Sequence, residues 1–590
     1  MDFKTHFRFL LISFLFFDAV DAMFGKRLGP DPELSAGSAA KKLKANIADL
    51  FLSNDISAQR AQTFFQQAAA AGLHDMHSVA ATGSKKNVHR NLLKKLLKGS
   101  KWPELYYAPV RYWNAEEQRV GTCLLPFLLP HELVYNISQH SSEQVGMYST
   151  DGMGQATRDH IVRAAQELAK NPHEIIGLGL WGDGTPCNWD RTQSLETWSL
   201  NFPGLKDQMG QLRIPVTSIN KKFVVKGETH DDILNVLVWS LNCLVSGELP
   251  STDHLGQPLV GTQRVKAAKK PLPCAILAEV RADWALLKGI FRFPQHNEKD
   301  GTCWQCEAKP EDLRCCTSDA RWRTARLDHW GLLKRMMEKG LTPSPTMSAP
   351  GVRSSIFLVD WLHCADQGVS ADLLGSYFLV LSKKFPGRGL AAQVKELYKD
   401  IKTWYRNNNV ESRLDDLKPS MLKKEEKGSK PKLRSKAAEC RALIPYALDS
   451  ANRFLDSSNP LEGSIKQAIV HLSACYSNLS ANSFNAEHMK EHSLKFCLLY
   501  VALEARDSRF CVKPKLHLFM ELTQVCSSCP SLFWTYRDED FGGFVAQISK
   551  KRGGHNKPGN TAKSVLLKFV TKHSLPRFAH SHSFINANVD

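Results

Sequence analysis

The fold of this chain is decided by residues 174–202, "EIIGLGLWGDGTPCNWDRTQSLETWSLNF". The apolar run that ends at Trp181 predicts a buried strand, and the alternating "SLETWSLNF" predicts a second strand after a short connection. Asp183 stands between two glycines where the first strand ends. A carboxylate in that place can be a turn former, a helix cap or a metal ligand, and other parts of the chain discriminate between these roles.

The segments that follow add further elements to the same sheet. Residues 211–225, "QLRIPVTSINKKFVV", predict a third strand, and the short connections indicate an antiparallel meander. Thr229 opens a predicted helix, with Asp232 three residues later as a capping-box-like pair. Residues 272–280, "LPCAILAEV", predict a fourth strand. We therefore expect three strands, a helix and then another strand.

This order of elements is that of an α/β protein with an RNase H-like core. In such a core the first strand and the strand after the helix lie side by side. Asp183 and Asp283, each at the end of one of these strands, are then expected to meet although they lie far apart in the sequence. The partner acid favours a metal-binding role for Asp183 over that of a turn former.

The rest of the chain divides by composition and periodicity. The first 173 residues hold a short leader and a basic region that we predict to be helical, whereas most of the chain after the core is again predicted as helical. The predicted divisions are 1–22, a signal peptide or upstream extension; 23–173, a helical, basic region; 174–320, the core; 321–510, a helical insertion with a Lys-rich linker at 412–438; 511–555, a helical segment; and 556–590, a basic flexible tail.

Charge and cysteine content limit the partners and the compartment. The 590 residues carry a net charge of +18, which favours a polyanion, either nucleic acid or an anionic membrane surface. The first 22 residues resemble a secretory signal, but a start at Met23 would make them an upstream extension. If the first 22 residues act as a signal, we expect the protein in the secretory pathway. If Met23 is the start, we expect a nuclear protein. No later segment predicts a stable transmembrane span, and the 15 cysteines indicate a mostly reduced protein.

Two carboxylates at neighbouring strand ends suit phosphoryl chemistry with two divalent metal ions. Mg²⁺, or Mn²⁺ in its place, takes oxygen ligands, and a pair of ions can assist both the attacking and the leaving oxygen. A third acid is needed to hold such a pair. Glu539 in "FWTYRDEDFGGFVAQ" is the best candidate, although Asp538 and Asp540 flank it. The predicted catalytic and metal-binding set is Asp183, Asp283 and Glu539.

A second metal site is predicted in "FPQHNEKDGTCWQCEA". Cys303 and Cys306 form a C-x-x-C clamp for zinc, with His296 as a further ligand. Unligated thiols and a disulfide are the alternatives. The candidates for the remaining ligand are Cys315, Cys316 and His329, and the more distant pair Cys526 and Cys529.

Basic side chains in two places are candidate DNA contacts. Lys94, Lys95 and Lys98 lie on a basic amphipathic helix, and Lys513 and Lys515 precede an apolar helix that begins near His517. In both places the competing interpretation is a solvated helix face. For Asp360 and His363, in "FLVDWLHCADQGVSADLLG", we favour a supporting role over a catalytic one.

These motifs, in this order, resemble those of DDE transposases of the CACTA-type, Plavaka and KDZ groups. The resemblance is carried by "GDGTPCNWDRTQSLETWSLNF", "VRADWALLKGIFRFPQHNEKDGTCWQC", "VDWLHCADQGVSADLLG" and "KPKLHLF…FWTYRDEDFGGFV", over about residues 174 to 555. The arrangement is also similar to a group of transposase-derived dinoflagellate proteins. It implies Asp183, Asp283 and Glu539 as catalytic acids and Cys303 and Cys306, with His296, as zinc ligands.

The sequence departs from this pattern in two places. Trp-Ala follows Asp283 where the relatives often have Pro-Ala, and Gly542-Gly543 after Glu539 weaken a helix. We therefore expect a transposase-like DNA-binding protein that cleaves and rejoins DNA if it is active. The alternatives are a domesticated, non-catalytic DNA-binding protein on the same fold and a secreted or endomembrane protein with paired cysteines. DNA is the expected partner, and a homo-oligomer is compatible with the sequence.

Overall fold

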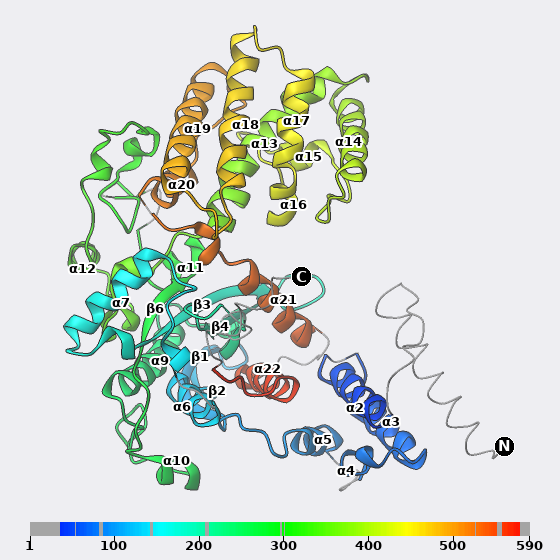
Figure 1. Cartoon of the computed structure of the whole chain (residues 1–590), viewed down its shortest axis with the longest axis vertical. Coiled ribbons are helices and arrows are strands. Elements are labelled where there is room, and N and C mark those ends of the chain that lie inside the picture. Colours follow the sequence, from blue (N-terminus) through cyan, green and yellow to red (C-terminus); the bar gives the residue numbers. More distant parts are fainter. Residues whose placement is uncertain are drawn as a thin grey trace, which may run out of the picture.

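The computed structural model describes residues 36–53, 55–81, 87–141, 145–206, 212–294, 298–299, 301–525, 527–550 and 557–578. These residues form a mixed α/β protein in which helices predominate (Figure 1). The predicted signal-like segment, residues 1–22, lies outside the described residues. Among the described helices, none has both the length and the apolar composition that crossing a membrane requires.

The central sheet has four strands in the order β5-β4-β3-β6. β3 (Ile176–Pro186) pairs antiparallel with β4 (Ser194–Asn201), which pairs antiparallel with β5 (Ile214–Asn220). The chain then crosses over through α9 (Thr229–Ser246) to β6 (Ala275–Arg281), which runs parallel to β3. The meander, the crossover helix and the parallel strand are those that the sequence predicts.

Helices cover this sheet (Figure 1). α7 (Gln155–Glu167) and α9 pack on β6, α21 (Tyr536–Lys550) packs on β3, and α22 (Pro558–Lys572) packs on β5. Every residue of β5 and β6 is buried. Strands that are covered on both faces need apolar side chains in both directions, which is why "AILAEV" is a nearly continuous apolar run.

The start of α9 differs from the predicted capping box. The Thr229 hydroxyl accepts a hydrogen bond from Val225 N at 2.8 Å and donates one to Arg111 O at 2.8 Å. Asp232 is turned toward Arg111, with Oδ1 2.6 Å from Nη2. The carboxylate therefore ties α9 to the preceding hairpin, because an arginine is a stronger partner than the backbone N–H of a helix start.

The N-terminal region contains a hairpin that the helical prediction missed. β1 (Tyr106–Asn114) and β2 (Arg119–Phe127) pair antiparallel over nine residues each. Before the hairpin, four helices enclose a small apolar core. They are α2 (Ala36–Leu52), α3 (Ala58–Ala70), α4 (His77–Ala80) and α5 (Val88–Leu96). α6 (Pro130–His140) follows the hairpin.

Short elements connect the sheet to a helical lobe, which is at the top of Figure 1. The connecting elements are α11 (Trp284–Gly289), α12 (His329–Glu338) and a π-helical segment, Leu362–Ser370, whereas α10 (Thr262–Ala267) lies in the crossover between α9 and β6. The lobe contains α13 (Ala371–Leu381), α14 (Leu390–Asn407), α15 (Pro419–Leu422), α16 (Ala437–Ala442), α17 (Ile444–Phe454), α18 (Pro460–Ser477) and α19 (Ala486–Arg506). α20 (Lys515–Met520) and a second π-helical segment, Glu521–Val525, lead back to α21.

Two segments that the sequence predicts to be flexible are packed. Residues 412–438 include the buried side chains of Leu414, Leu417, Leu422 and Leu433, so this stretch is not an exposed linker. The C-terminal part from 557 forms α22, which contributes Val565, Leu566 and Phe569 to the main core. In both segments isolated apolar residues between lysines are anchored by helices far away in sequence.

Candidate functional site

Asp183 and Asp283 lie just beyond the last residue pair that joins β3 to β6. β3 itself continues to Pro186 and pairs Asp183 with Thr197 of β4, so Asp183 is not at the strand end that the sequence predicts. β3 and β6 run parallel with Trp181 opposite Arg281, so Asp183 and Asp283, each two residues further along, are neighbours. Asp283 Oδ1 accepts a hydrogen bond from Leu286 N at 2.7 Å and thereby caps α11. Asp183 Oδ1 accepts one from Gly184 N at 2.7 Å. Burial, and next the charge of Asp283, raise the pKa of Asp183 to about 6.

Glu539 joins these two acids from the first turn of α21. Its carboxyl group lies close enough to that of Asp183 for each to shift the pKa of the other. Burial and the negative charge of Asp183 raise the pKa of Glu539 to about 8. Oε1 of Glu539 is shielded from solvent and has no hydrogen-bond partner among the described residues. Three carboxyl groups from three elements therefore converge on one place.

Burial distinguishes Glu539 from the two acids that flank it in sequence. Asp538 is fully buried, accepts a hydrogen bond from Arg213 Nε, and lies 3.6 Å from Arg281 Nη1 through Oδ2. Asp540 is exposed. Asp538 thus holds α21 against the sheet through two arginines, and this anchor turns the next side chain toward Asp183.

Gly542 allows α21 to approach β3. A Cβ atom there would lie 3.1 Å from the Trp181 ring and 3.2 Å from Thr185 Oγ1, whereas a Cβ on Gly543 would meet nothing within 4 Å. The weakness of the helix that the sequence predicts at Gly542-Gly543 does not interrupt α21, which is continuous through both residues. At position 542 close packing outweighs the lower helix propensity of glycine.

We expect Gly542→Leu to lower the free energy of unfolding by about 1–3 kcal/mol, because the added side chain overpacks the α21–β3 contact. Gly543→Leu is the matched control and is expected to leave stability unchanged or raised by up to about 1 kcal/mol. Denaturant unfolding of both variants measures the difference. Equal effects at the two positions would contradict the packing role of Gly542.

The glycines on either side of Asp183 allow β3 to lie close against β4. A Cβ on Gly182 would lie 2.7 Å from the Trp198 ring on β4, and a Cβ on Gly184 would lie 2.9 Å from Ser194 Oγ. Both glycines therefore accommodate side chains of the neighbouring strand. The position of Asp183 follows from this tight pairing of β3 with β4.

Asp360 and His363 connect the acids to the π-helical segment. The Asp360 carboxylate accepts hydrogen bonds from Thr535 N and Oγ1, each at 2.9 Å, and from His363 Nδ1 at 2.7 Å. His363 Nε2 then lies 3.8 Å from Glu539 Oε1. Burial opposes the charged imidazole, but the hydrogen bond and charge of Asp360 raise the pKa of His363 to about 9. Asp360 thus orients the histidine toward Glu539.

Asp366 lies one turn further along the same π-helical segment. Its oxygens accept hydrogen bonds from Tyr476 Oη at 2.5 Å and from Tyr536 Oη at 2.7 Å. Burial raises the pKa of Asp366 to about 7. Because Tyr536 opens α21, this carboxyl group also fixes the helix that carries Glu539.

The stability contribution of Asp366 is expected to depend on pH. Its folded-state pKa is raised, so the protonated carboxyl group favours folding at low pH, and this contribution is lost as the pH rises to about 7. Asp366→Asn, which stays neutral, should gain about 3 kcal/mol relative to the wild type between pH 5 and pH 8. Denaturant unfolding at both pH values measures the gain. A difference that does not change with pH would contradict it.

Lys513 and Lys515, predicted as DNA contacts, are engaged within the fold. Lys513 Nζ forms an ion pair with the buried Asp372 at 2.5 Å. Lys515 Nζ donates to His363 O at 2.7 Å, and burial lowers the pKa of Lys515. Lys515 lines a cavity of about 240 Å³ together with Asp283, Asp360 and His363. Lys513 therefore forms a structural ion pair, because its partner Asp372 lies inside the helical lobe. Lys515 supports the acid cluster through its hydrogen bond to the backbone of His363.

A second cluster forms around the C-x-x-C pair. The ligand atoms of Cys303, Cys306, His517 and Glu521 all lie within 4.8 Å of one another, and all four residues are buried. Cys306 Sγ is 3.3 Å from His517 Nε2, and Cys303 Sγ is 3.8 Å from Glu521 Oε1. Two thiols, an imidazole and a carboxylate are a donor set that can hold a metal ion.

The surroundings of this cluster stabilise the thiolate of Cys303, whereas the hydrogen bond with Cys303 and burial raise the pKa of Cys306. Arg326 Nη1 lies 2.8 Å from Glu521 Oε2, and Trp322 packs edge-on against the His517 ring. Burial opposes ionisation of Cys303, but hydrogen bonds from Cys306 and His517 lower its pKa to about 6. A thiolate at neutral pH is what metal binding requires.

The ligands beyond the cysteine pair differ from those predicted nearby in sequence. His296 and Cys526 lie outside the described residues. Cys316 is hydrogen-bonded to Cys497, and Cys529 donates to Leu479 O at 3.4 Å, so neither joins the cluster. Cys315 and His329 are also not among its members. The H-x-x-x-E spacing of His517 and Glu521 on adjoining helical turns was the signal that could have identified the two missing donors.

The basic helix of the N-terminal region is α5. It buries Leu92 and Leu93, and Lys94 is exposed on its outer face, as is Lys98 just beyond its end. Lys95 is half-buried. The amphipathic pattern is therefore explained by packing, and the exposed lysines remain available to a ligand.

No protein-family model matches this chain, and no curated protein is detectably similar to it. The function is therefore inferred from the two clusters and from the surfaces around them.

Proposed function

We propose that this protein is a transposase-like DNA phosphoryl-transfer enzyme with an RNase H-like core, which holds two Mg²⁺ or Mn²⁺ ions between Asp183, Asp283 and Glu539. The observation that carries the proposal is the convergence of these three carboxyl groups just beyond the last residue pair that joins β3 to β6. The strand order β5-β4-β3-β6 supports the core, and the resemblance of the motifs supports the transposase class.

The residues fit hard divalent cations. All three donors are carboxylates, which are the ligands that such ions prefer. Burial, and next the charge of a neighbouring acid, raise the pKa values of Asp183 and Glu539, and a bound cation would relieve that repulsion. Glu539 Oε1, which is buried without a hydrogen bond, is a donor atom whose desolvation a cation would compensate.

The chain's own residues prepare the site for reaction. The cap that Asp283 forms on α11 fixes one of its oxygens, and Asp360 fixes the ring of His363. The protonated His363, 3.8 Å from Glu539, can stabilise negative charge at the edge of the cluster. The chemistry that two bound ions supply is activation of the attacking oxygen, from water or a DNA 3′-hydroxyl, and stabilisation of the leaving oxygen.

For the second cluster we propose a structural zinc ion. Two thiolates, one imidazole and one carboxylate complete a tetrahedral set with no position left for substrate, and their burial excludes water. α20 carries both His517 of this cluster and Lys515 of the acid cluster. A metal ion bound here would therefore also fix the position of Lys515, which donates a hydrogen bond to His363 O.

The test of the enzymatic proposal is DNA nicking by the purified full chain. Supercoiled plasmid is incubated with Mg²⁺ or Mn²⁺, with Ca²⁺ or a chelator as controls, and the new ends are labelled by a polymerase that requires a 3′-hydroxyl. We expect nicks with 3′-hydroxyl ends in Mg²⁺ or Mn²⁺ alone. Binding to DNA without such nicking would leave a non-catalytic DNA-binding protein and overturn the proposed activity.

A further inference from the structure

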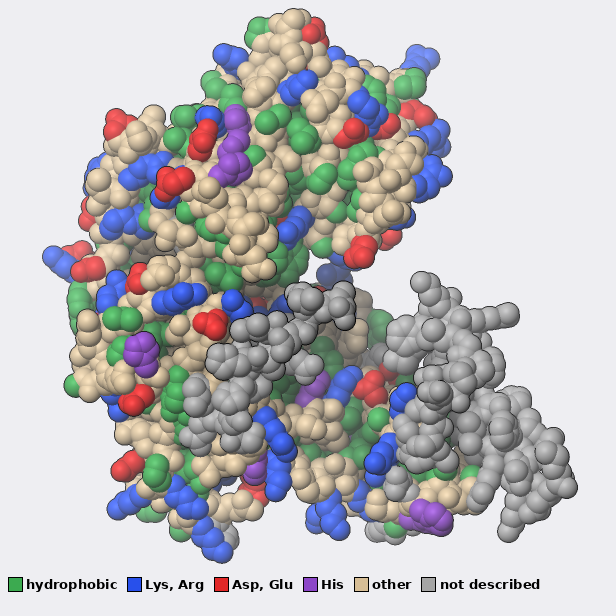
Figure 2. Space-filling model, in the orientation of Figure 1, with side chains coloured by type: hydrophobic (Ala, Val, Ile, Leu, Met, Phe, Trp, Pro, Cys, Tyr) green, Lys and Arg blue, Asp and Glu red, His purple; other side chains and the backbone are tan. Residues whose placement is uncertain are grey.

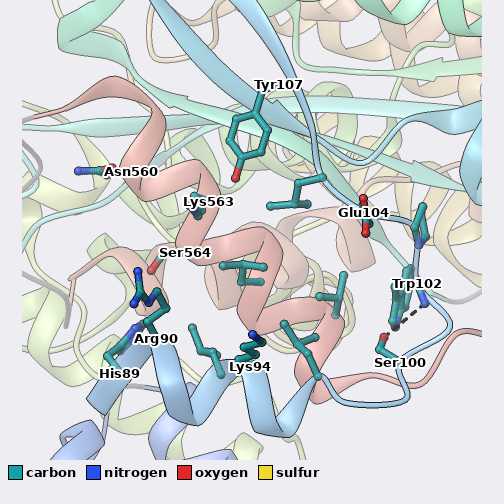
Figure 3. A pocket seen from close by; sticks show the side chains of 16 residues that line it. His89, Arg90, Lys94, Ser100, Trp102, Glu104, Tyr107, Asn560, Lys563 and Ser564 are labelled. Atoms are coloured by element: carbon teal, nitrogen blue, oxygen red, sulfur yellow. Dashed lines mark hydrogen bonds between the residues drawn. The ribbon is translucent and has the colours of Figure 1, made fainter. Parts of the chain in front are cut away.

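A groove of about 830 Å³ lies between α5, residues 100–107 and α22, away from both metal clusters (Figure 3). It is lined by elements that are far apart in sequence and that belong to two apolar cores, the N-terminal helices and the main core. Figure 1 shows α5 and α22 side by side at this junction. The groove is therefore a product of the tertiary structure alone.

The inside of the groove is apolar. Leu93 and Val570 are buried there, and Leu97, Leu105 and Leu567 are half-buried. Tyr107 from β1 is 41% exposed, and its ring forms part of the wall (Figure 3). An exposed aromatic ring beside apolar side chains is suited to the flat face of another ring.

The outer side chains of the groove are mainly cationic. Arg90 and Lys94 of α5 and Lys563 of α22 are all exposed, and Arg90 and Lys94 form no ion pair with any described residue. Lys563 Nζ lies 5.7 Å from the centre of the Tyr107 ring. Glu104 is the one acidic residue among those that line the groove. The lysines and arginines seen over much of the surface in Figure 2 are interspersed with acids, so this concentration is local.

The ends of the two helices add to this positive potential. Figure 3 shows His89 and Arg90 of α5 toward the same end of the groove as Asn560 and Lys563 of α22. His89, Arg90 and Asn560 belong to the first turns of helices nine and 15 residues long, and Lys563 lies in the second turn of α22. Helix N-termini carry partial positive charge that attracts anions. The ligand that fits is therefore negatively charged at this end and flat and apolar further in.

We propose that this groove binds an unpaired stretch of DNA, with phosphates on Arg90, Lys94 and Lys563 and a base against Tyr107. The inference rests on the proposed DNA chemistry for the choice of DNA as the polyanion. A duplex presents phosphates and sugars outward and keeps its bases stacked, so it would leave the apolar lining unfilled. An acidic peptide supplies negative charge but no flat face for Tyr107. Single strands use both cations and stacking surfaces.

The charge contacts are tested by anisotropy with a labelled single strand of about 20 nucleotides and the full chain. The triple variant Arg90→Ala, Lys94→Ala, Lys563→Ala should bind at least about tenfold more weakly, and the slope of log K against log salt should fall by about 2. The matched control is Arg388→Ala, Lys395→Ala, Lys402→Ala on and beside α14, three exposed cations of which Lys402 also lies over a tyrosine ring. The control should stay within about twofold of the wild type. Equal losses in the two triple variants would overturn the proposal.

The stacking contact is tested at Tyr107. Tyr107→Ala should weaken single-strand binding about tenfold, and Tyr107→Phe should retain it, because the ring face provides the contact. Neither change should alter the affinity for duplex. A loss for duplex and single strand alike, or stronger competition by polyglutamate than by unlabelled single strand, would overturn the choice of ligand.

This experiment is independent of catalysis. Binding is measured in a chelator, so a chain that binds single strands through Arg90, Lys94 and Lys563 but never nicks DNA would contradict the proposed activity and leave the groove assignment intact. A chain that nicks DNA but binds equally well without these cations would contradict the groove assignment alone. Circular dichroism of each variant shows that the fold is retained.

Discussion

Asp183→Asn is expected to reduce metal-dependent DNA nicking by about 10³-fold, while the variant folds at least as stably as the wild type. Asparagine keeps the size of the side chain but removes the charge that a divalent cation needs. Asp183 interacts with both other acids, Asp283 and Glu539. Loss of this one carboxylate should therefore disturb the whole metal-binding set.

The stability of this variant provides a second readout with a defined sign. The folded-state pKa of Asp183 is raised to about 6, so its protonated form favours folding, and that contribution is lost as the pH rises through 6. A neutral asparagine avoids the loss, so the variant in a chelator at pH 8 should melt above the wild type. A variant that is inactive only because it is misfolded would melt below it.

Asp190→Asn is the matched control for this experiment. Asp190 follows Asp183 by seven residues, has the same side chain and is exposed. Its replacement changes the net charge equally but touches neither Asp283 nor Glu539. We expect full nicking activity, and equal activity in Asp183→Asn and Asp190→Asn would reject the three-acid site.

The second large effect is expected at the cysteine cluster. The wild-type chain should contain one zinc ion at this cluster, and Cys303→Ser with Cys306→Ser should remove it and lower Tm by about 10 °C. The four ligands come from segments about 200 residues apart, since Cys306 contacts His517 and Cys303 contacts Glu521. A metal that joins distant segments opposes unfolding because both must be released together.

Two measurements check this prediction, namely elemental analysis of the purified chain and its thermal unfolding with and without a strong zinc chelator. Cys243→Ser with Cys475→Ser is the control, because it also removes two buried thiols but outside the cluster. The control should keep its zinc and its response to the chelator. A wild-type chain without zinc, or a chelator effect that persists in the Cys303/Cys306 variant, would show that the cluster is not a metal site.

Loss of zinc should also reduce nicking, although neither Cys303 nor Cys306 belongs to the acid cluster. His517 and Lys515 are two residues apart on α20, and Lys515 holds the carbonyl group of His363. If α20 shifts, His363 loses its support and its position beside Glu539 changes. A zinc-free variant with unaltered nicking would show that the two clusters work independently.

Local sequence patterns predicted most of the central sheet. The apolar run before Asp183, the alternation in "SLETWSLNF" and the apolar "AILAEV" correspond to β3, β4 and β6, because strand and helix periodicity is a property of neighbouring residues. The same order predicted that Asp183 and Asp283 would meet, since parallel neighbouring strands end at the same edge. The helical prediction for the region of β1 and β2 came from the lysine-rich amphipathic stretch before them.

What the sequence by itself determined is thus the order of the strands, the pairing of Asp183 with Asp283 and the cysteine pair of the second cluster. Only the tertiary structure decided that Glu539 rather than Asp538 faces the acids, that His517 and Glu521 complete the second cluster, and that Gly542 serves close packing. It also decided that α5 and α22 enclose a groove. The physical reason is that hydrophobic periodicity acts over a few residues, whereas these features depend on side chains that meet only when segments hundreds of residues apart pack together.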